Sequence, residues 1–381
     1  MNIYITAGEE LANKLKSKYP NIIPFNEDLS IGVVSSASFT QEFIMERCES
    51  LGVSKDIYLS KLALFLEVIN KIQPFDNVEL FFGEDKTCLA NRKFLLELLN
   101  DKVYKVILHV INEYTCEELQ VLEYNSTRYF ENDPRLKEKV KNNERNFENL
   151  FSKVEKHLGY EFITDVKLKD MYDHNYFRVD SDKIDELVFE EINRYRKEKN
   201  YTHLKIITSK RNNYLLNKGL EETHLLTLVK TNDFHIKIPQ ISVNYLNLRD
   251  NSIADDLINL ELKYYGEEYG IDFSNRKMER YCYVGPLDNR FNFYASYHEG
   301  KIIASCYTFL DNGILSLDAL LVEKEYRNKC VASNLLKHLK DKYNVPLCLH
   351  ADFDETSKDL YTKLGFKIIN ETFEYLLLDS K

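Results

Sequence analysis

The sequence of 381 residues lacks the usual signs of an exported, disulfide-bonded or zinc-binding protein. Its seven cysteines are scattered and odd in number, and they include no C-x-x-C pair, which disfavours a disulfide framework or a zinc site. We therefore expect no metal. The first residues, "MNIYITAGEELANKLK", are typical of a strand and a charged helix and not of a secretion signal. These absences favour a cytoplasmic location.

Two further features are missing. No apolar run approaches the roughly 18 residues that a membrane-spanning helix requires. There is no basic excess, because 61 Asp and Glu stand against 51 Lys and Arg, and an acidic balance disfavours nucleic acid and favours basic partners or amine substrates. We expect neither a membrane nor a nucleic-acid partner. The sequence gives no prediction of the oligomeric state.

The length favours two or three domains over a single core. Up to about residue 130, short apolar runs alternate with amphipathic ones, which predicts a parallel sheet with helices on its faces. A charged segment with one proline, 131–146, is interpreted as a linker or an exposed helix that ends this domain. A second boundary is expected at "TNDFHIKIPQ", 231–240. The predicted domains are 1–135, 140–232 and 240–381.

The last domain has the clearest strand pattern. After an expected strand at 241–248 and a helix at 252–265, three period-two strands are separated by the turn signals Glu299-Gly300 and Asn312-Gly313. A faint repeat is also present: the stretch that begins at Tyr214 can be laid over the one that begins at Leu360, so that Gly219 falls on Gly365. Both a duplication and a chance helix-glycine-strand pattern remain open.

A basic turn joins one of these strands to a helix in "VEKEYRNKCVASNLL". The first N–H groups of a helix have no partner within it, and the helix dipole favours an anion there. Arg327 and Lys329 add positive charge, and small residues such as Ala332 and Ser333 allow an anion to approach the backbone. By itself such a turn is more often a solvated helix cap, so the pattern alone does not distinguish an anion-binding site from a cap.

The strand order around this turn resembles the GNAT superfamily of acyl-CoA N-acyltransferases. The resemblance covers about 241–379 and includes "EYRNKCVASNLL", the strand "PLCLHAD" and the segment "ETSKDLYTKLGF". It implies a mixed, splayed β-sheet flanked by helices, with acetyl-CoA as co-substrate. In that family the backbone of Arg/Gln-x-x-Gly-x-Gly/Ala holds the coenzyme A pyrophosphate. Arg327 and Ala332 match this pattern, whereas Cys330 stands in place of the first glycine.

Glycine is used where a backbone approaches a ligand closely or adopts a positive φ. A helical φ at Cys330 would still permit phosphate binding, and loss of coenzyme binding is the alternative. The resemblance implies further contacts with the coenzyme. The strand before the loop would make them through its exposed backbone, and the segment "ETSKDLYTKLGF" would make others. The predicted coenzyme-binding residues are Leu320, Leu321, Val322, Arg327, Asn328, Lys329, Cys330, Val331, Ala332, Ser333, Asp354 and Ser357.

Two residues are predicted to be catalytic. The resemblance places Tyr361 where a tyrosine protonates the departing thiolate, with a structural tyrosine as the alternative. Asp318 interrupts the apolar run "ILSLDALLV", and period-two alternation puts it on the same face as Leu320. A buried acid in a strand is costly unless paired, so Asp318 is the predicted base and a core acid is the alternative. Glu323 and His350 are weaker candidates.

The middle unit resembles a truncated GNAT-like repeat that precedes the catalytic domain in some tandem members. Acidic residues surround the start of its long expected helix, Ser181 to Lys199, and they would oppose phosphate. We expect no coenzyme there, and a role as structural support or as one wall of the substrate cleft. The acidic residues are Asp180, Asp182, Asp185 and Glu186.

The first unit resembles an uncharacterised bacterial family of Rossmann-like domains. Its polar residues fall near predicted strand ends, where open α/β sheets bind ligands, but Gly8 alone gives no argument for a nucleotide. Loop and cap residues, or an acidic cleft for a partner or substrate, both remain open. The residues are Glu27, Asp28, Glu84, Asp85 and Asn91.

The leading hypothesis is an acetyl-CoA-dependent N-acetyltransferase that transfers its acetyl group directly to an amine. A small-molecule amine or a protein amine is the expected acceptor, with a polyamine, an aminoglycoside-like amine, a small amino compound and a protein lysine all open. The substitutions at Cys330 and Asp354 motivate the alternative, a coenzyme-sensing or regulatory protein with an inactive GNAT unit. Transfer of a longer acyl group also stays open.

Overall fold

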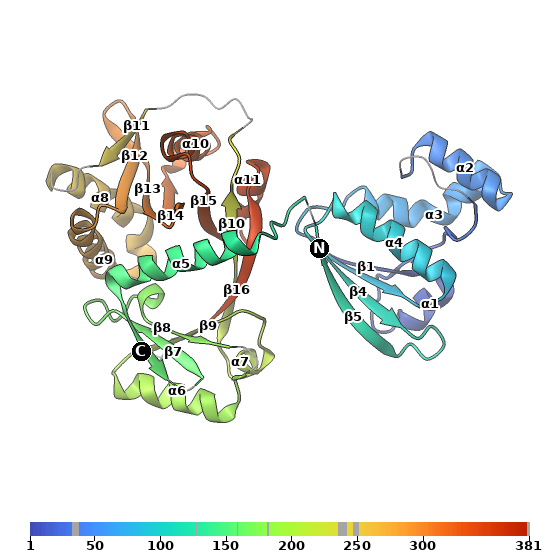
Figure 1. Cartoon of the computed structure of the whole chain (residues 1–381), viewed down its shortest axis with the longest axis horizontal. Coiled ribbons are helices and arrows are strands. Elements are labelled where there is room, and N and C mark those ends of the chain that lie inside the picture. Colours follow the sequence, from blue (N-terminus) through green and yellow to red (C-terminus); the bar gives the residue numbers. More distant parts are fainter. Residues whose placement is uncertain are drawn as a thin grey trace. The chain divides into compact units, whose positions relative to one another are not determined.

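A computed structural model describes most of the chain, and it forms two compact units, Met1–Phe130 and Glu131–Lys381 (Figure 1). Each is described by itself. All seven cysteines are free thiols. None of the helices in the described ranges is both long and apolar enough to cross a membrane. The described residues are 1–32, 38–126, 128–157, 159–180, 183–234, 242–246 and 251–378.

The first unit is a five-stranded sheet with the order β2-β1-β3-β4-β5. The first four strands are parallel, and β5 runs antiparallel to β4 at the edge. The predicted α/β class is confirmed, although β5 was not expected. The elements are β1 (Asn2–Ala7), α1 (Gly8–Leu15), β2 (Ile23–Phe25), α2 (Gln41–Leu51), α3 (Lys55–Ile69), β3 (Asn77–Phe82), α4 (Lys86–Asn100), β4 (Lys105–Ile111) and β5 (Glu118–Asn125).

The second unit contains two successive series of elements. The first series is α5 (Pro134–Phe151), β6 (Lys153–His157), β7 (Tyr160–Thr164), η1 (Tyr172–His174), β8 (Tyr176–Val179), α6 (Glu186–Glu198), β9 (His203–Thr208), α7 (Asn213–Asn217) and β10 (Glu221–Lys230). The second series is β11 (Val243–Leu246), α8 (Asn251–Tyr269), α9 (Ile271–Val284), η3 (Gly285–Leu287), β12 (Phe291–His298), β13 (Lys301–Asp311), β14 (Ile314–Val322), η4 (Lys324–Tyr326), α10 (Val331–Tyr343), β15 (Leu347–Asp352), α11 (Ser357–Lys363) and β16 (Lys367–Leu378).

The two series share one sheet of eleven strands, in the order β11-β12-β13-β14-β15-β10-β16-β9-β8-β7-β6. Each contains an antiparallel meander followed by helix, strand, helix and strand. The last strand of each series lies in the other half: β10 pairs with β15 and β16, and β16 pairs with β9. Gly219 and Gly365, the glycines that the sequence repeat aligns, precede these exchanged strands with φ of +84° and +85°.

The expected boundary at 231–240 falls largely on residues 235–241, outside the described part of the chain, and the predicted strand at 241–248 is described only from 242 to 246. The division of this unit into two domains therefore stays a prediction. The two hairpin turns are confirmed. In both Glu299-Gly300 and Asn312-Gly313 the two central residues have positive φ, as the right-handed twist of a tight hairpin favours.

The segment 131–146 is not a linker, because most of it belongs to α5, which packs on the sheet. The helix starts at Pro134, after the Asp133 side chain accepts hydrogen bonds from the first backbone N–H groups. The buried amide of Asn143 donates to three backbone carbonyls of the β13–β14 hairpin, at Phe309, Asp311 and Ile314. The linker alternative is therefore wrong, and the alternative of a helix is confirmed, although this helix has a buried face and is not simply exposed.

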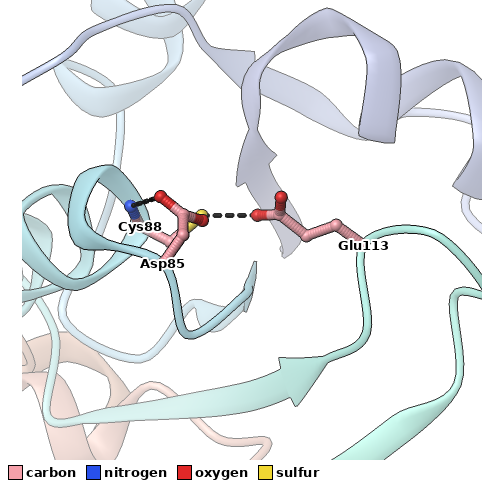
Figure 2. A group of neighbouring side chains, drawn as sticks. All are labelled: Asp85, Cys88 and Glu113. Atoms are coloured by element: carbon pink, nitrogen blue, oxygen red, sulfur yellow. Dashed lines mark hydrogen bonds between the residues drawn. The ribbon is translucent and has the colours of Figure 1, made fainter.

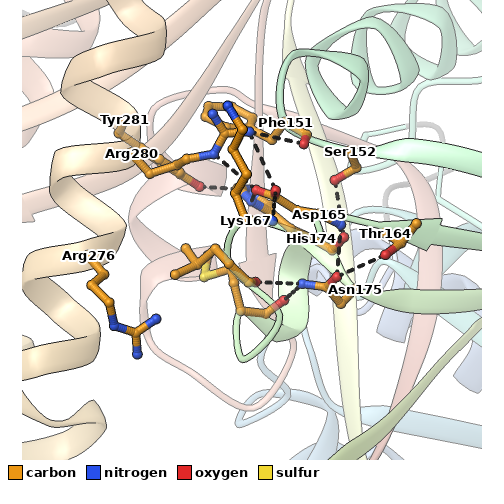
Figure 3. Close-up of polar contacts among 12 residues, drawn as sticks. Phe151, Ser152, Thr164, Asp165, Lys167, His174, Asn175, Arg276, Arg280 and Tyr281 are labelled. Carbon is orange, nitrogen blue, oxygen red and sulfur yellow. Dashed lines mark hydrogen bonds and ion pairs between the residues drawn. The ribbon is translucent and has the colours of Figure 1, made fainter. Parts of the chain in front are cut away.

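A polar network holds the middle of the chain against α9 (Figure 3). Asp165, which follows β7, accepts a hydrogen bond from the guanidinium of Arg280 at 3.2 Å. The Nε2 atom of His174 lies 2.9 Å from the Tyr281 hydroxyl, and both residues are buried. Buried polar groups with partners of this kind fix the relative position of two elements. The loop between β7 and β8 and helix α9 therefore form one rigid wall.

Candidate active site

The strands β14 and β15 separate part of the way along their length. They pair in parallel at only three positions, Leu315 with Leu347, Ser316 with Cys348 and Leu317 with Leu349. Beyond this point β14 continues to Val322, paired on its other side with β13. The expected splay of the sheet is present, and it frees the backbone of Leu320, Leu321 and Val322 on the side toward β15 for an extended ligand.

A β-bulge at Ala319, where φ is +46°, lies beside the splay. The pairing with β13 shifts there, so that Asp318 lies opposite Tyr307 and Leu321 lies opposite Ser305. Paired residues share a face, so Asp318 is on the face of Leu321 and not on that of Leu320. The expected alternation is wrong because a bulge adds a residue.

Asp318 is also exposed and not buried, which removes the burial argument for its role. One carboxylate oxygen accepts a hydrogen bond from the backbone N–H of Ala319 at 2.7 Å, which helps to fix the bulge. The role of Asp318 as the catalytic base stays a prediction. The Asp318 carboxylate comes from the residue next to the last β14–β15 pair, Leu317 with Leu349, and so lies where the two strands separate.

The loop from β14 to α10 has an unusual backbone. Asn328 and Cys330 both have left-handed conformations, with φ of +59° and +61°, so Cys330 adopts a positive φ of the kind for which glycine is usual. Left-handed and right-handed residues in succession turn backbone N–H groups toward one point and form an anion-binding nest. The side chain of Cys330, the N-cap residue of α10, makes no capping hydrogen bond. The N–H groups of Val331, Ala332 and Ser333 are thus available to a ligand.

Two exposed basic side chains flank this nest. The Arg327 guanidinium donates from Nε to the Val322 carbonyl at 3.1 Å and lies 5.6 Å from the centre of the Tyr264 ring. The Lys329 ammonium lies 5.3 Å from the ring centre of Tyr326. Positive charge beside a nest favours a phosphate, and the pyrophosphate cradle stays a prediction.

Glu323, one of the weaker base candidates, is tied to α8. Its carboxylate accepts hydrogen bonds from the Lys263 ammonium at 2.6 Å and from the Tyr264 hydroxyl at 2.5 Å. Burial acts to raise the pKa of Glu323, but these two partners outweigh it and hold the pKa below its usual value. A carboxylate held in this way is a poor proton acceptor.

The buried Tyr361 side chain comes from α11. Burial, followed by the charges of Cys306, Asp318 and Glu355, raises the pKa of Tyr361 to about 12. The phenol is therefore neutral at physiological pH and can donate a proton. Because Asp318 contributes to this shift, the two predicted catalytic residues lie within electrostatic range of one another.

The remaining predicted coenzyme contacts lie just before and at the start of α11. Asp354 is exposed, and its backbone N–H donates to the Asp352 carboxylate at 2.8 Å. Ser357 is the first residue of the helix. Because the Asp354 carboxylate is exposed, it could repel a coenzyme phosphate or contact a basic substrate, and the structure is compatible with both.

Sequence reasoning missed two acidic residues near the splay, because they come from elements distant in sequence. Glu261 of α8 is buried, and burial and the charge of Asp318 raise its pKa although the Lys277 ammonium lies 3.7 Å away. Glu144 of α5 contacts His350 of β15. One signal was available for Glu144, since it continues the helical stripe of buried Leu136 and Val140 with a charged residue.

The acidic residues predicted at the start of α6 act as caps and ion-pair partners. The Asp185 carboxylate accepts a hydrogen bond from the Val188 N–H at 2.9 Å. Glu186 accepts hydrogen bonds from Lys218 at 2.8 Å and Tyr214 at 2.5 Å. Asp180 lies just before this helix, and Asp182 lies outside the described residues.

Two of the polar residues predicted in the first unit are structural. Glu27 and Arg47 form a fully buried ion pair with an N–O distance of 2.9 Å, and the Tyr58 hydroxyl donates to the same carboxylate. The buried Asn91 amide bonds to the backbone of residues 27 and 29. Burial and pairing of this kind hold a loop in place and leave little for a ligand.

The other acidic residues of the first unit lie after the carboxyl ends of β2, β3 and β4. Asp28 accepts a hydrogen bond from Thr87, and Glu84 is exposed. Asp85 caps α4 through the N–H groups of Thr87 and Cys88, and the Cys88 thiol donates to Glu113 at 2.6 Å (Figure 2).

Asp85, Cys88 and Glu113 bring three donor atoms within 4.8 Å of one another. Within the described ranges this is the one group whose donor types suit a transition metal. It lies at the N-terminus of α4, however, where the helix dipole opposes a cation, and the Asp85 carboxylate is already used as a cap. The arrangement is a helix start with internal hydrogen bonds.

Comparison with known protein families finds a match for the second half of the splayed sheet. Residues 289–368 match the family described as "Acetyltransferase (GNAT) domain". This range contains β12 to α11, and therefore the splay, the nest and Tyr361. The resemblance to GNAT acetyltransferases is thus confirmed for this part of the chain. Comparison with curated proteins finds no match.

Solved structures share the fold at low sequence identity. A functionally unknown conserved protein from Staphylococcus epidermidis ATCC 12228 has a TM-score of 0.51 and 14% identity, over 59% of this chain and 93% of its own. A GCN5-related N-acetyltransferase from Kribbella flavida has a TM-score of 0.43 and 10% identity, over 63% of this chain and 93% of its own. The first likeness supports the mixed α/β fold, and the second is too low to carry an argument.

Proposed function

We propose that the protein is an acetyl-CoA-dependent N-acetyltransferase. One observation carries the proposal: the splay of β14 from β15 ends at a loop whose backbone forms a nest before an uncapped helix. An open strand edge suits the extended pantetheine arm, and a nest with basic neighbours suits a pyrophosphate. The family match over the same residues supports this assignment.

The residues present fit this co-substrate. The N–H groups from Asn328 to Ser333 would hold the pyrophosphate, with Arg327 and Lys329 at its edge. The backbone of β14 from Leu320 to Val322 would orient the arm, which supplies the activated acetyl group as a thioester. Tyr361 would protonate the sulfur as the carbon–sulfur bond breaks, since its phenol keeps its proton at physiological pH.

The acceptor is proposed to be an amine, on a small molecule or on a protein. Asp318, exposed at the mouth of the splay, would attract the ammonium form of such an acceptor. The wall formed by α9 and the loop between β7 and β8 would border the acceptor side, which gives the middle of the chain a role without a coenzyme of its own. The seven free thiols fit the proposed cytoplasmic location.

Isothermal titration calorimetry of the full chain with acetyl-CoA tests the proposal. We expect saturable binding below millimolar concentration, and no heat of binding up to millimolar acetyl-CoA would refute it. Mass spectrometry of reactions with a panel of polyamines, amino sugars and lysine peptides should then show one class gaining an acetyl group. Binding without transfer to any amine would favour the alternative, a coenzyme sensor.

A further inference from the structure

His350 lies at the point where the sheet opens. The last parallel pair joins Leu317 of β14 to Leu349 of β15, so Asp318 and His350 are the first residues on either side of the gap. The pair before it joins Ser316 to Cys348. Because side chains alternate along a strand, Asp318 and His350 point to the same face, across the opening from one another.

A carboxylate from outside the family-matched region orients this imidazole. The Nε2 atom of His350 lies 3.0 Å from a carboxylate oxygen of Glu144 on α5. Helix α5 is itself fixed by the buried Asn143 and by Leu136 and Val140, which pack in one cluster with Cys348, two residues before His350. Both partners therefore sit on elements that packing holds in place, as a positioned catalytic pair requires.

The charges around His350 favour its protonated form. Burial by itself would lower the pKa of His350, but the hydrogen bond to Glu144 and the charges of Glu144, Asp318 and Glu374 outweigh it, and the pKa is raised. Glu374 is in turn paired with the Lys205 ammonium at 2.7 Å. The His350 side chain is nevertheless 44% exposed, so a substrate amine can reach it.

We propose that His350 accepts the proton of the substrate ammonium and that Glu144 is its positioning residue. This inference rests on the proposed acetyltransferase function. When Nε2–H donates to Glu144, the lone pair lies on Nδ1, which is the accepting atom. The substrate N–H bond breaks and an Nδ1–H bond forms. The neutral amine then forms the carbon–nitrogen bond as the carbon–sulfur bond breaks, and Tyr361 gives its proton to the sulfur. The second proton that the nitrogen loses on becoming an amide returns to the Tyr361 phenolate, and His350 releases its proton to solvent.

The assignment also gives Asp318 a defined part. Imidazole takes a proton more readily than a carboxylate near neutral pH, so His350 is the better acceptor of the two. Asp318 faces it across the gap and stabilises the imidazolium charge that forms. Its contribution is then electrostatic, and its removal weakens the base without abolishing it.

The pH dependence of acetyl transfer tests this directly. Only the neutral imidazole accepts a proton, so a raised pKa places the acid limb of kcat/KM above pH 6.5, the ordinary value for histidine. The His350→Gln variant should lose that limb, and its kcat/KM at pH 8 should fall by about 10²- to 10³-fold. Acetyl-CoA affinity measured by calorimetry should be unchanged, because His350 lies outside the nest.

Glu144→Gln tests the positioning role. It keeps a hydrogen-bond acceptor but removes the charge that raises the pKa of His350, so the acid limb should move to lower pH. His224→Gln is the matched control, since His224 of β10 pairs in the same way with Glu371 at 3.2 Å and should leave the limb in place. Titration of the His350 ring proton by NMR, assigned with His350→Gln, should show the same shift without any substrate.

The outcomes separate the two proposals. A wild-type protein that binds no acetyl-CoA, or acetylates no amine, overturns the proposed function and this inference with it. An active wild type whose acid limb survives in His350→Gln overturns the inference alone. An acid limb and NMR titration that stay in place in Glu144→Gln overturn the role of Glu144, because a merely structural contact would not move them.

Discussion

The two halves of the eleven-stranded sheet differ at the start of one corresponding helix, α6 in the first half and α10 in the second. In each half a meander leads through a loop to a helix and then to a parallel strand, β8 to β9 and β14 to β15. Before α6 the loop is acidic, and Asp185 caps the helix through its own side chain. Before α10 the loop is basic, two residues have positive φ, and the side chain of Cys330 makes no capping hydrogen bond.

This difference teaches that a shared topology does not by itself make a ligand site. A helix start whose N–H groups already have a carboxylate partner has nothing left to offer an anion. The other half also lacks the proposed proton donor, since the repeat places Leu215 where the second half has Tyr361. The following four experiments test this contrast, in order of decreasing expected effect.

Tyr361→Phe should have the largest effect. Loss of the proton donor is expected to lower kcat by about 10²- to 10⁴-fold, while the acetyl-CoA dissociation constant from calorimetry changes little. Since the pKa of Tyr361 is about 12, the wild type should show no basic limb from this group below about pH 11. Tyr214→Phe, on the corresponding helix α7, serves as the control. Equal rates for Tyr361→Phe and wild type would remove Tyr361 from the mechanism.

Ala332→Glu places a negative charge in the nest and should weaken acetyl-CoA binding by about 100-fold or more. The fold should tolerate it, because an acid in the first turn of a helix is stabilising by about 0.3–1 kcal/mol. Leu187→Glu makes the same change in the exposed first turn of α6 and should leave binding unaltered. Both are measured by calorimetry and thermal unfolding. Unchanged binding in Ala332→Glu would contradict the cradle.

Arg327→Ala should weaken acetyl-CoA binding by roughly tenfold, the scale of one charge-assisted contact. The loss should shrink at high salt, since exposed charges are screened. Lys183→Ala, in the acidic loop before α6, is the control. Titrations at low and high ionic strength check both, and a salt-independent loss would show that Arg327 acts through packing on Tyr264 instead.

Cys330→Gly should have the smallest effect. A left-handed φ costs a side chain of this kind about 1–2 kcal/mol, partly offset by the greater freedom of glycine in the unfolded chain. We expect a small gain in the free energy of unfolding, measured with urea, and an acetyl-CoA affinity that is equal or a few-fold stronger. Weaker binding in Cys330→Gly would mean that the thiol itself contacts the ligand.

Local chemistry made much of this fold predictable from the sequence. The hairpin turns follow from the preference of Glu299-Gly300 and Asn312-Gly313 for left-handed backbone. Helices such as α4 follow from periodicity and a capping residue, Asp85. The nest loop and Tyr361 were found through a family resemblance, because their spacing alone is weak evidence.

The sequence predictions that were wrong concern features that depend on contacts between distant residues or on backbone torsions. The bulge at Ala319 places Leu320 and Val322 on the face opposite to Asp318, where alternation predicts a shared face, and spacing contains no signal for a bulge. The charged segment that was interpreted as a linker or an exposed helix is α5, which packs on the sheet. Its Asn143 side chain bonds to backbone groups more than 160 residues away, and the local sequence gives no sign of these partners. Glu144 reached the site by the same route, so no motif near His350 could reveal it.

The exchange of β10 and β16 has a consequence for how this part of the protein can fold and evolve. Neither half can complete its sheet until the other half has been synthesised and has supplied its strand. Many contacts therefore join residues that are remote in sequence, and such a topology slows folding. A chain cut between the halves would leave β15 and β9 with open edges that invite aggregation. The half with the acidic loop thus supplies a strand, β10, that the sheet of the other half needs, whether or not it binds a ligand itself.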